Sequence, residues 1–258
     1  MNRPLFSIII TTHERSNLLS RALQSLINQS FQNFEIILIS DCFDIGTIEI
    51  ARTHLRKSDS FVMNPNLIGP AESRNLGIEL SKGKWITFLD DDDAYSKDYL
   101  KEIDSSLFAN KSDVYYCNYI KVKEDLDKSE LIEGHQYNIK NIDIKSLQIS
   151  NFIPNSCIIL NSHLARLVKF DSTLESHEDW DWLIQLSNNS EFQHIDITGP
   201  IIYENISSSR NLESHKTKDV AFDFLTIYRK WRSKDKETKS LRRNCLVNMG
   251  LTIDESFL

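Results

Sequence analysis

The chain has 258 residues, 40% hydrophobic and 26% charged, so it can bury a substantial core and lies at the upper edge of a single domain. Its formal net charge of -7 argues against a nucleic-acid partner, because a phosphate backbone is bound by a basic face. The opening apolar segment, residues 5–10, is too short for a signal-peptide core or a membrane span. Composition therefore predicts a cytoplasmic protein, or one that contacts the inner face of the plasma membrane only at its surface.

The first ninety residues alternate between apolar runs and amphipathic helical patterns. The continuous apolar runs are typical of buried strands and predict strands at 6–10, 35–39, 61–63 and 85–89. Between them we expect helices at 18–27, 45–55 and 70–81. Asn17 is the expected N-cap of the first helix, and Pro70 suits the first turn of the third. This alternation predicts an α/β fold with a mostly parallel sheet and helices on both faces.

The second half of the chain is less regular. We expect a helix at 96–107, strands at 114–122 and 157–160, and a short helix at 163–167. Residues 123–150 are polar and rich in Asn, Lys and Asp, and no element is predicted for them. We expect residues 1–218 to form the main domain and residues 219–258 a small helical appendage.

Four consecutive carboxylates, residues 90–93, follow the predicted strand at 85–89. Their repulsion in a compact loop would raise their pKa values, and a hard divalent cation ligated by oxygens relieves it. Ligands also gather outside the carboxyl ends of strands in open α/β sheets. The loop is therefore a candidate site for a metal and a phosphate ester. The alternative is a solvated acidic turn ahead of the next helix.

A second acidic cluster surrounds Trp180 and Trp182. Glu178 and Asp179 fall near the first turn of a predicted helix, where free N–H groups favour carboxylates, so a capping role alone can explain one of them. An anionic Asp at the mouth of a cleft is also what a general base requires, and flat indole rings suit a sugar. Both tryptophans can equally belong to the core.

Several short motifs follow one another in order between residues 5 and 190. They are the opening run Ser7–Arg15, the pair Ser40-Asp41, Asn66-x-x-Gly69, Ala71-x-x-Arg74-Asn75-x-Gly77, the acidic run Asp90–Asp93 and Glu178-Asp179-Trp180. Each motif alone is weak. In this order and spacing they resemble the family-2 glycosyltransferases of the GT-A fold, where the acidic run corresponds to an Asp-x-Asp metal motif.

The resemblance implies a Rossmann-like GT-A fold and an inverting, metal-dependent transferase of the hexosyltransferase type. Mg²⁺ or Mn²⁺ would bind the departing diphosphate, with Asp92 as the expected ligand. The division of roles among Asp90, Asp91 and Asp92 stays open. Asp179 would be the general base, with Glu178 and Trp180 beside it on the acceptor side.

The resemblance also implies a set of residues that bind the nucleotide sugar. They are Thr11, Thr12, His13, Glu14, Asp41, Asn66, Arg74, Asp90 and Asp91. Arg74 would steady the charge of the acidic loop, and the alternative is a surface ion pair on its helix. His13 and Glu14 replace an aromatic residue and an amide that are common in the family. The resemblance therefore implies less about recognition of the nucleotide base than about the fold. His215 is a candidate for an additional metal ligand.

Residues 219–243 are basic and aromatic on an otherwise acidic protein. Such a segment can lie on an anionic membrane surface, where lipid-linked acceptors are found. The alternative is a helix that packs its aromatic side chains against the main domain and leaves a solvated basic face.

The expected function is transfer of a sugar from a nucleoside-diphosphate sugar, a UDP-sugar as first expectation, to a glycan or lipid-linked acceptor. The setting we expect is surface polysaccharide or lipopolysaccharide assembly. One alternative is a non-catalytic protein of the same fold that binds sugar nucleotides or glycans. Another is a metal-dependent phosphohydrolase with an Asp nucleophile, suggested by Asp90-x-Asp92 behind a strand.

Overall fold

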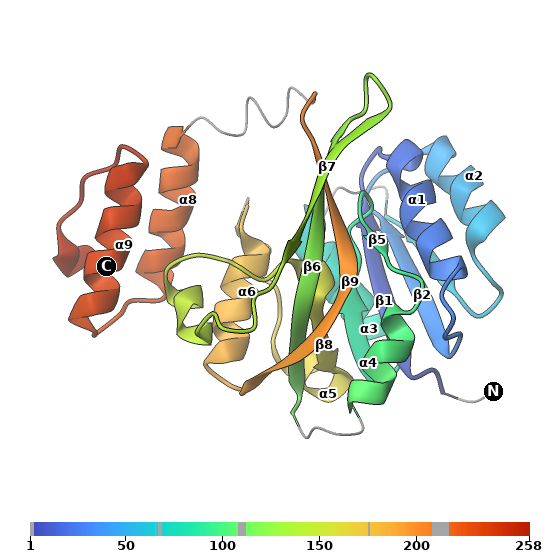
Figure 1. Cartoon of the computed structure of the whole chain (residues 1–258), viewed down its shortest axis with the longest axis horizontal. Helices are drawn as coiled ribbons and strands as arrows, with labels where there is room; N and C mark the ends of the chain where they lie inside the picture. The colour runs from blue at the N-terminus through green and yellow to red at the C-terminus, as the bar shows by residue number, and fades with distance from the viewer. Residues whose placement is uncertain (1–2, 65, 67–68, 108–111, 175, 208–216) are drawn as a thin grey trace.

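The computed structural model describes residues 3–64, 66, 69–107, 112–174, 176–207 and 217–258. At its centre lies one nine-stranded sheet (Figure 1). The strands follow the order β3-β2-β1-β4-β8-β6-β9-β5, and β7 pairs with β6.

The first half of the chain forms the parallel part of this sheet, as the alternating pattern predicts. Its strands are β1 (Phe6–Thr12), β2 (Phe34–Ser40), β3 (Ser60–Met63) and β4 (Trp85–Phe88). The helices between them are α1 (Ser16–Ile27), α2 (Ile45–His54) and α3 (Gly69–Leu80). In Figure 1, α1 and α2 lie together on one side of β1 and β2, while α3 packs on these strands from the other. The carboxyl ends of β1, β2 and β4 therefore open at the same edge.

The second half extends the sheet with mostly antiparallel pairs. β8 (Ile158–Asn161) joins β4, and β6 (Val114–Asp125) joins β8, both antiparallel. β9 (Phe192–Asn205) runs parallel to β6 and also pairs with the short β5 (Ala94–Tyr95). The α4 helix (Tyr99–Leu107) begins three residues later than predicted.

Two predictions about local structure differ from the structure. Asn17 is not the N-cap of α1, because the helix already begins at Ser16 and Arg15 occupies the cap position without a side-chain cap bond. The polar stretch 123–150, for which no element is predicted, contains β7 (Glu130–Tyr137) and the single 3₁₀ turn η1 (Ile144–Gln148). All eight residues of β7 are exposed, so no apolar alternation marks this strand in the sequence.

The remaining helices lie beyond the sheet. α5 (Ser162–Leu167) follows β8, and α6 (Glu178–Ser187) lies between the sheet and the C-terminal pair α8 (Thr217–Lys230) and α9 (Lys236–Asn248) (Figure 1). The predicted boundary at residue 218 falls in the first turn of α8. Within the described ranges, no helix combines the length and the apolar character that a membrane crossing needs.

Tyr228 and Trp231 of the C-terminal segment pack inward, as the second alternative for this segment predicts, whereas Phe222 is exposed. Tyr228 is 0% exposed, and its ring contacts that of Trp180 on α6 with centroids 5.8 Å apart. Trp231 donates its indole N–H to Asp181 over 2.7 Å. The exposed basic residues of this segment are Arg229, Lys230, Arg232, Lys234, Lys236 and Arg243, and Lys230 is paired with Asp171 and Asp181.

Candidate active site

A cavity of about 410 Å³ lies at the carboxyl ends of β1 and β4. It is lined by Thr11, Thr12, His13, Arg15, Pro70, Arg74, Asp90, Asp91, Asp92 and Glu178. Most of the residues singled out in the sequence thus come together in one place, although they lie as far apart in the chain as Thr11 and Glu178. Asp41, Asp179, Glu14 and Asn66 are not among the lining residues, and His215 lies outside the described residues.

The acidic loop after β4 holds its carboxylates in different environments. Asp91 is 4% exposed, accepts a hydrogen bond from Thr12 Oγ1 over 2.6 Å and pairs with Arg15 Nη1 at 3.2 Å. Burial raises the pKa of Asp91 to about 6, against the lowering effects of Thr12 and Arg15. Asp92 is more accessible, with 34% of its side chain exposed, and it also contacts Arg15 Nη1, at 3.1 Å. Burial and the charge of Asp90 raise the pKa of Asp92.

Asp93 has a structural role that the sequence does not reveal. Its side chain is buried, and it accepts hydrogen bonds from Ser156 Oγ and from the backbone N–H of Tyr203 on β9, both over 3.1 Å. Burial, together with Asp90 and Asp92, raises its pKa well above the ordinary value. Asp93 therefore fastens the acidic loop to the second half of the sheet. Four identical adjacent residues offer no signal by which to choose it.

Arg74 connects the two acidic clusters across the cavity. This side chain is 8% exposed and donates to Asp90 Oδ1 over 3.2 Å and to Glu178 Oε1. Burial lowers its pKa, but Asp90, Glu178 and Asp179 together raise it above the ordinary value, so the guanidinium stays charged. The alternative of a surface ion pair is wrong for Arg74, because its partners are the buried or half-buried groups of the site itself.

Glu178 and Asp179 open helix α6 but face different surroundings. Glu178 reaches the cavity, where it meets Arg74. Asp179 accepts a hydrogen bond from the backbone N–H of Trp180 over 2.7 Å and one from Asn151 Nδ2 over 3.1 Å. Burial raises the pKa of Asp179, Glu178 raises it further, and Arg74 opposes both. A raised pKa suits a carboxylate that must accept a proton near neutral pH.

The two tryptophans of the second cluster belong to the core. Trp180 and Trp182 are both 0% exposed, and their indole N–H groups donate to the carbonyls of Leu147 and Val168. A role as flat surface for a sugar ring is therefore wrong for both in this structure. Trp180 remains next to Asp179, where it fixes the position of the segment that contains Leu147.

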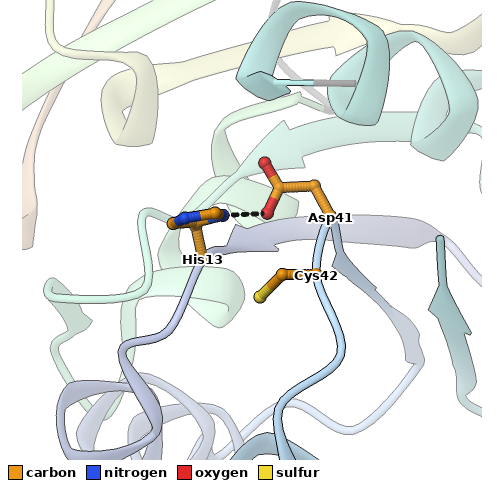
Figure 2. A group of neighbouring side chains, drawn as sticks. All are labelled: His13, Asp41 and Cys42. Carbon is orange, nitrogen blue, oxygen red and sulfur yellow. Dashed lines mark hydrogen bonds and ion pairs between the residues drawn. The ribbon is translucent and has the colours of Figure 1, made fainter. Parts of the chain in front are cut away.

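The far end of the site holds a small polar cluster from the ends of β1 and β2. Figure 2 shows His13 and Asp41 pointing toward each other, with Cys42 beside them. His13 Nδ1 lies 2.7 Å from Asp41 Oδ1. Among the residues that the model describes, these three form the one group of at least three His, Cys, Asp or Glu side chains with ligand atoms within 4.8 Å of one another. Among the described side chains, the carboxylates of the acidic loop thus do not form such a group.

This fold and this arrangement of acidic loop, arginine and Glu-Asp pair define a GT-A glycosyltransferase. The chain belongs to glycosyl transferase family 2, whose family model matches residues 7–167. The resemblance found in the sequence is thereby confirmed, and the phosphohydrolase alternative is wrong.

The curated relatives support the same assignment as an enzyme. An uncharacterized glycosyltransferase of Haemophilus influenzae is 27% identical over 242 residues, which cover 89% of this chain and 90% of the relative. The amylovoran biosynthesis glycosyltransferase AmsB of Erwinia amylovora is 25% identical over 235 residues, which cover 86% of this chain and 76% of the relative.

Solved structures show the same fold at low sequence identity. The S. aureus protein TarS (residues 1–349), in complex with UDP-GlcNAc, superposes with a TM-score of 0.69 at 17% identity, over 95% of this chain and 72% of the other. The mannosyltransferase PcManGT from Pyrobaculum calidifontis, in complex with GDP-Man and Mn²⁺, gives a TM-score of 0.68 at 14% identity, over 97% of this chain and 71% of the other.

Proposed function

We propose that this glycosyltransferase moves a sugar from a nucleoside-diphosphate sugar to a hydroxyl group of a glycan or lipid-linked acceptor, in the assembly of a surface polysaccharide or lipopolysaccharide. The observation that carries the proposal is the single cavity in which the ends of β1 and β4, Arg74 and Glu178 meet. The neighbours TarS and PcManGT, bound to UDP-GlcNAc and GDP-Man, support the donor class, with a UDP-sugar as the first choice. The name of AmsB supports a role in polysaccharide synthesis.

We assign the nucleotide to the end of the cavity formed by β1. Thr11, Thr12 and His13 line it, and Asp41 lies within hydrogen-bond distance of His13. Arg74 and Asp90 would face the ribose or the phosphates. We leave Glu14 and Asn66 out of the proposal, because both are exposed and neither lines the cavity.

The acidic loop fits a divalent cation, with Asp92 as the first-choice ligand and Asp90 or Asp91 in support. The exposed fractions of the Asp92 and Asp90 side chains, 34% and 38%, leave their oxygens accessible. Mg²⁺ is commonly held by one or two carboxylates together with substrate phosphates, so an open set of oxygens suits it, and the same applies to Mn²⁺. A bound cation would supply positive charge that stabilises the departing diphosphate.

On the acceptor side we assign the general base to Asp179. It would take the proton of the acceptor hydroxyl while the hydroxyl oxygen forms its bond to the anomeric carbon and the bond to the diphosphate breaks. A single displacement of this kind inverts the anomeric carbon. Glu178 would hold Arg74 in place between the two halves of the cavity, as its ion pair indicates.

We further propose that residues 1–218 form the catalytic domain and that the C-terminal pair contacts an anionic membrane surface through its basic side chains. The exposed residues Arg229, Arg232, Lys234 and Lys236 support this contact. The aromatic residues Tyr228 and Trp231 do not contribute, because they pack against α6 and its surroundings.

A thermal-shift panel of nucleoside diphosphates with and without Mn²⁺ tests the donor and metal assignments together. A ligand at a hundred times its dissociation constant adds about 2.7 kcal/mol to the free energy of unfolding, so the melting temperature should rise by roughly 5–10 °C. Asp92→Asn should abolish the Mn²⁺-dependent part of the shift. It should also abolish slow hydrolysis of the matching sugar nucleotide.

Asp113→Asn is the matched control, since Asp113 is exposed and lies outside the cavity. This variant should respond like the wild-type protein. A full Mn²⁺-dependent shift in Asp92→Asn would remove Asp92 as the ligand, and the absence of any nucleotide-dependent shift in the wild type would remove the donor assignment.

A further inference from the structure

Three consecutive backbone carbonyls next to the site are each bound by a side chain from a different helix. Trp180 of α6 donates to the Leu147 carbonyl over 2.6 Å. Arg242 of α9 donates to the Gln148 carbonyl over 2.8 Å, and Tyr228 of α8 donates to the Ile149 carbonyl over 2.6 Å. Residues 144–151, which we call the tethered segment, are therefore fixed between the Glu-Asp helix and the C-terminal pair.

Arg242 is the principal anchor of the tethered segment. Its side chain is 0% exposed, and it also donates to Gln148 Oε1 over 2.9 Å and to the Trp231 carbonyl over 2.7 Å. Among the described residues Arg242 has no carboxylate partner within salt-bridge distance. A buried guanidinium that is satisfied by carbonyl and amide oxygens costs desolvation energy, so its role is to hold these backbone positions rather than to neutralise a charge.

At the end of the tethered segment Asn151 points its amide at the proposed base. Its Oδ1 accepts a hydrogen bond from the Ile153 N–H over 3.0 Å, and this bond fixes which side of the amide is the donor. The Nδ2 group is thereby directed to Asp179 Oδ2, 3.1 Å away. Because the other Asp179 oxygen accepts from the Trp180 N–H, both carboxylate oxygens have one fixed donor.

We propose that Asn151 is a positioning residue for Asp179, held in place by α8 and α9 through the tethered segment. The inference rests on the proposed function, in which Asp179 is the general base. It makes the C-terminal pair part of the acceptor side of the site, although none of the pair's described side chains lines the cavity. A fixed donor on each oxygen orients the carboxylate and favours its charged form.

The charged and titratable groups around Asp179 come from three elements. Glu178 precedes it on α6, Arg74 approaches from α3, and His177 lies before the helix with its ring 3.7 Å from Asp223 of α8. None of these groups is altered when Asn151 is replaced. A change in the titration of Asp179 in an Asn151 variant therefore reports the loss of the amide donor.

The test follows Asp179 directly, by carboxyl-carbon NMR of protein labelled at aspartate, with its signal assigned by its loss in Asp179→Asn. We expect Asn151→Ala to raise the titration midpoint of Asp179 by about 0.5–1 pH unit, and Asn151→Asp to raise it further by adding a like charge. Asn141→Ala is the control, since Asn141 is an exposed asparagine of the polar stretch that precedes Asn151. An unchanged midpoint in Asn151→Ala would overturn the inference.

Hydrolysis of UDP-GlcNAc or GDP-mannose with Mn²⁺ gives the second readout. Asn151→Ala should lower kcat about tenfold with little change in KM and move the acidic limb of the kcat/KM profile upward by the same 0.5–1 unit. Tyr228→Phe, which removes the hydroxyl that binds the Ile149 carbonyl and also contacts Cys245, should give a smaller change in the same direction. Equal losses of stability in both variants without a shift of the limb would indicate a purely structural role.

The two proposals fail in distinguishable ways. Wild-type rates in Asp179→Asn would exclude Asp179 as the general base. Alternatively, Asp179→Asn could be inactive while Asn151→Ala keeps the wild-type pH profile. This result would leave the proposed function intact and exclude only the role of Asn151.

Discussion

Asp91 is a buried carboxylate whose pKa lies near 6, so its charge destabilises the folded protein at neutral pH. In the unfolded chain its pKa is close to 3.9. Between these two values the folded state binds more protons than the unfolded state. The free energy of unfolding therefore falls as the pH rises through this window. A cation bound to the loop would reverse part of this loss.

Asp91→Asn should flatten this pH dependence. We expect the free energy of unfolding of the wild-type protein to fall by about 1–3 kcal/mol more than that of the variant between pH 4 and pH 7.5, since two pKa units correspond to roughly 2.7 kcal/mol. Urea unfolding in the presence of EDTA at three pH values measures the difference. Parallel curves for the two proteins would show that Asp91 does not titrate in this range.

At the scale of single residues, the sequence predicts the parts of the site that belong to an ordered motif. Asp90, Asp91, Asp92 and Arg74 belong to such motifs and line one cavity, while their roles remain predictions. Asn151 could not be predicted, because it lies in a polar stretch without periodicity and meets Asp179 only through the tertiary fold. Arg15 was visible in the opening motif, but its pairing with Asp91 and Asp92 requires the positions of both loops.

At the scale of elements, Gly77 explains how closely α3 approaches β1. A Cβ at this position would lie 2.5 Å from Cγ2 of Ile9, a buried and β-branched side chain. Alanine is the better helix former by about 1 kcal/mol, so the effect of Gly77→Ala on stability depends on whether this gain exceeds the cost of crowding Ile9. The glycine therefore sets the distance between the helix and the central strand.

Gly77→Ala should lower the free energy of unfolding by about 1–2 kcal/mol net, through overpacking at Ile9. Gly134→Ala in the exposed strand β7 is the control, because a Cβ there meets only Val122 at an ordinary 3.7 Å. Urea unfolding of both variants makes the comparison. A Gly77→Ala protein as stable as the wild type would mean that α3 can move away from β1 without cost.

The elements that sequence patterns missed have physical reasons. β9 contains Gly199 and Pro200, and its register against β6 shifts in this region. Proline lacks the N–H of the strand ladder, so such a run argues against a strand when the sequence is read alone. β5 has two residues and exists only through its pairing with β9. By contrast, the buried strands β1, β2 and β4 were predicted, since continuous apolar runs mark them.

At the scale of the whole molecule, the C-terminal pair is attached by polar contacts to α6. Asp181 accepts from Lys230 over 2.9 Å and from the indole of Trp231 over 2.7 Å. The sequence predicted a basic, aromatic helical segment but could not decide which side chains face inward. The attachment uses Tyr228 and Trp231 and leaves most of the basic residues exposed to solvent.

The proposed membrane contact predicts binding to anionic liposomes that weakens as salt is raised. Each exposed basic residue near such a surface contributes about 1 kcal/mol, so reversing four charges should weaken binding by roughly a hundredfold or more at low salt. The changes are Arg229, Arg232, Lys234 and Lys236 to Glu. Sedimentation with vesicles of anionic lipid measures the effect.

A matched control reverses four exposed lysines on the sheet side of the molecule, Lys57, Lys82, Lys97 and Lys101. These changes alter the net charge nearly equally and should weaken binding far less. Equal losses of liposome binding in both proteins would show a general effect of net charge rather than a specific contact. If the wild-type protein does not bind at low salt, the proposed membrane contact is excluded.

Arg74 places a single guanidinium between a carboxylate of the acidic loop and one of the Glu-Asp helix. A ligand that draws Asp90 away from Arg74 would leave the guanidinium paired with Glu178 alone. A ligand that displaces Glu178 would leave it paired with Asp90 alone. If the proposed donor draws Asp90 away from Arg74, it would change the affinity of the site for the acceptor, and the acceptor would change the affinity for the donor by the same factor. Under the proposed function, donor and acceptor would then bind cooperatively or anticooperatively through this one side chain.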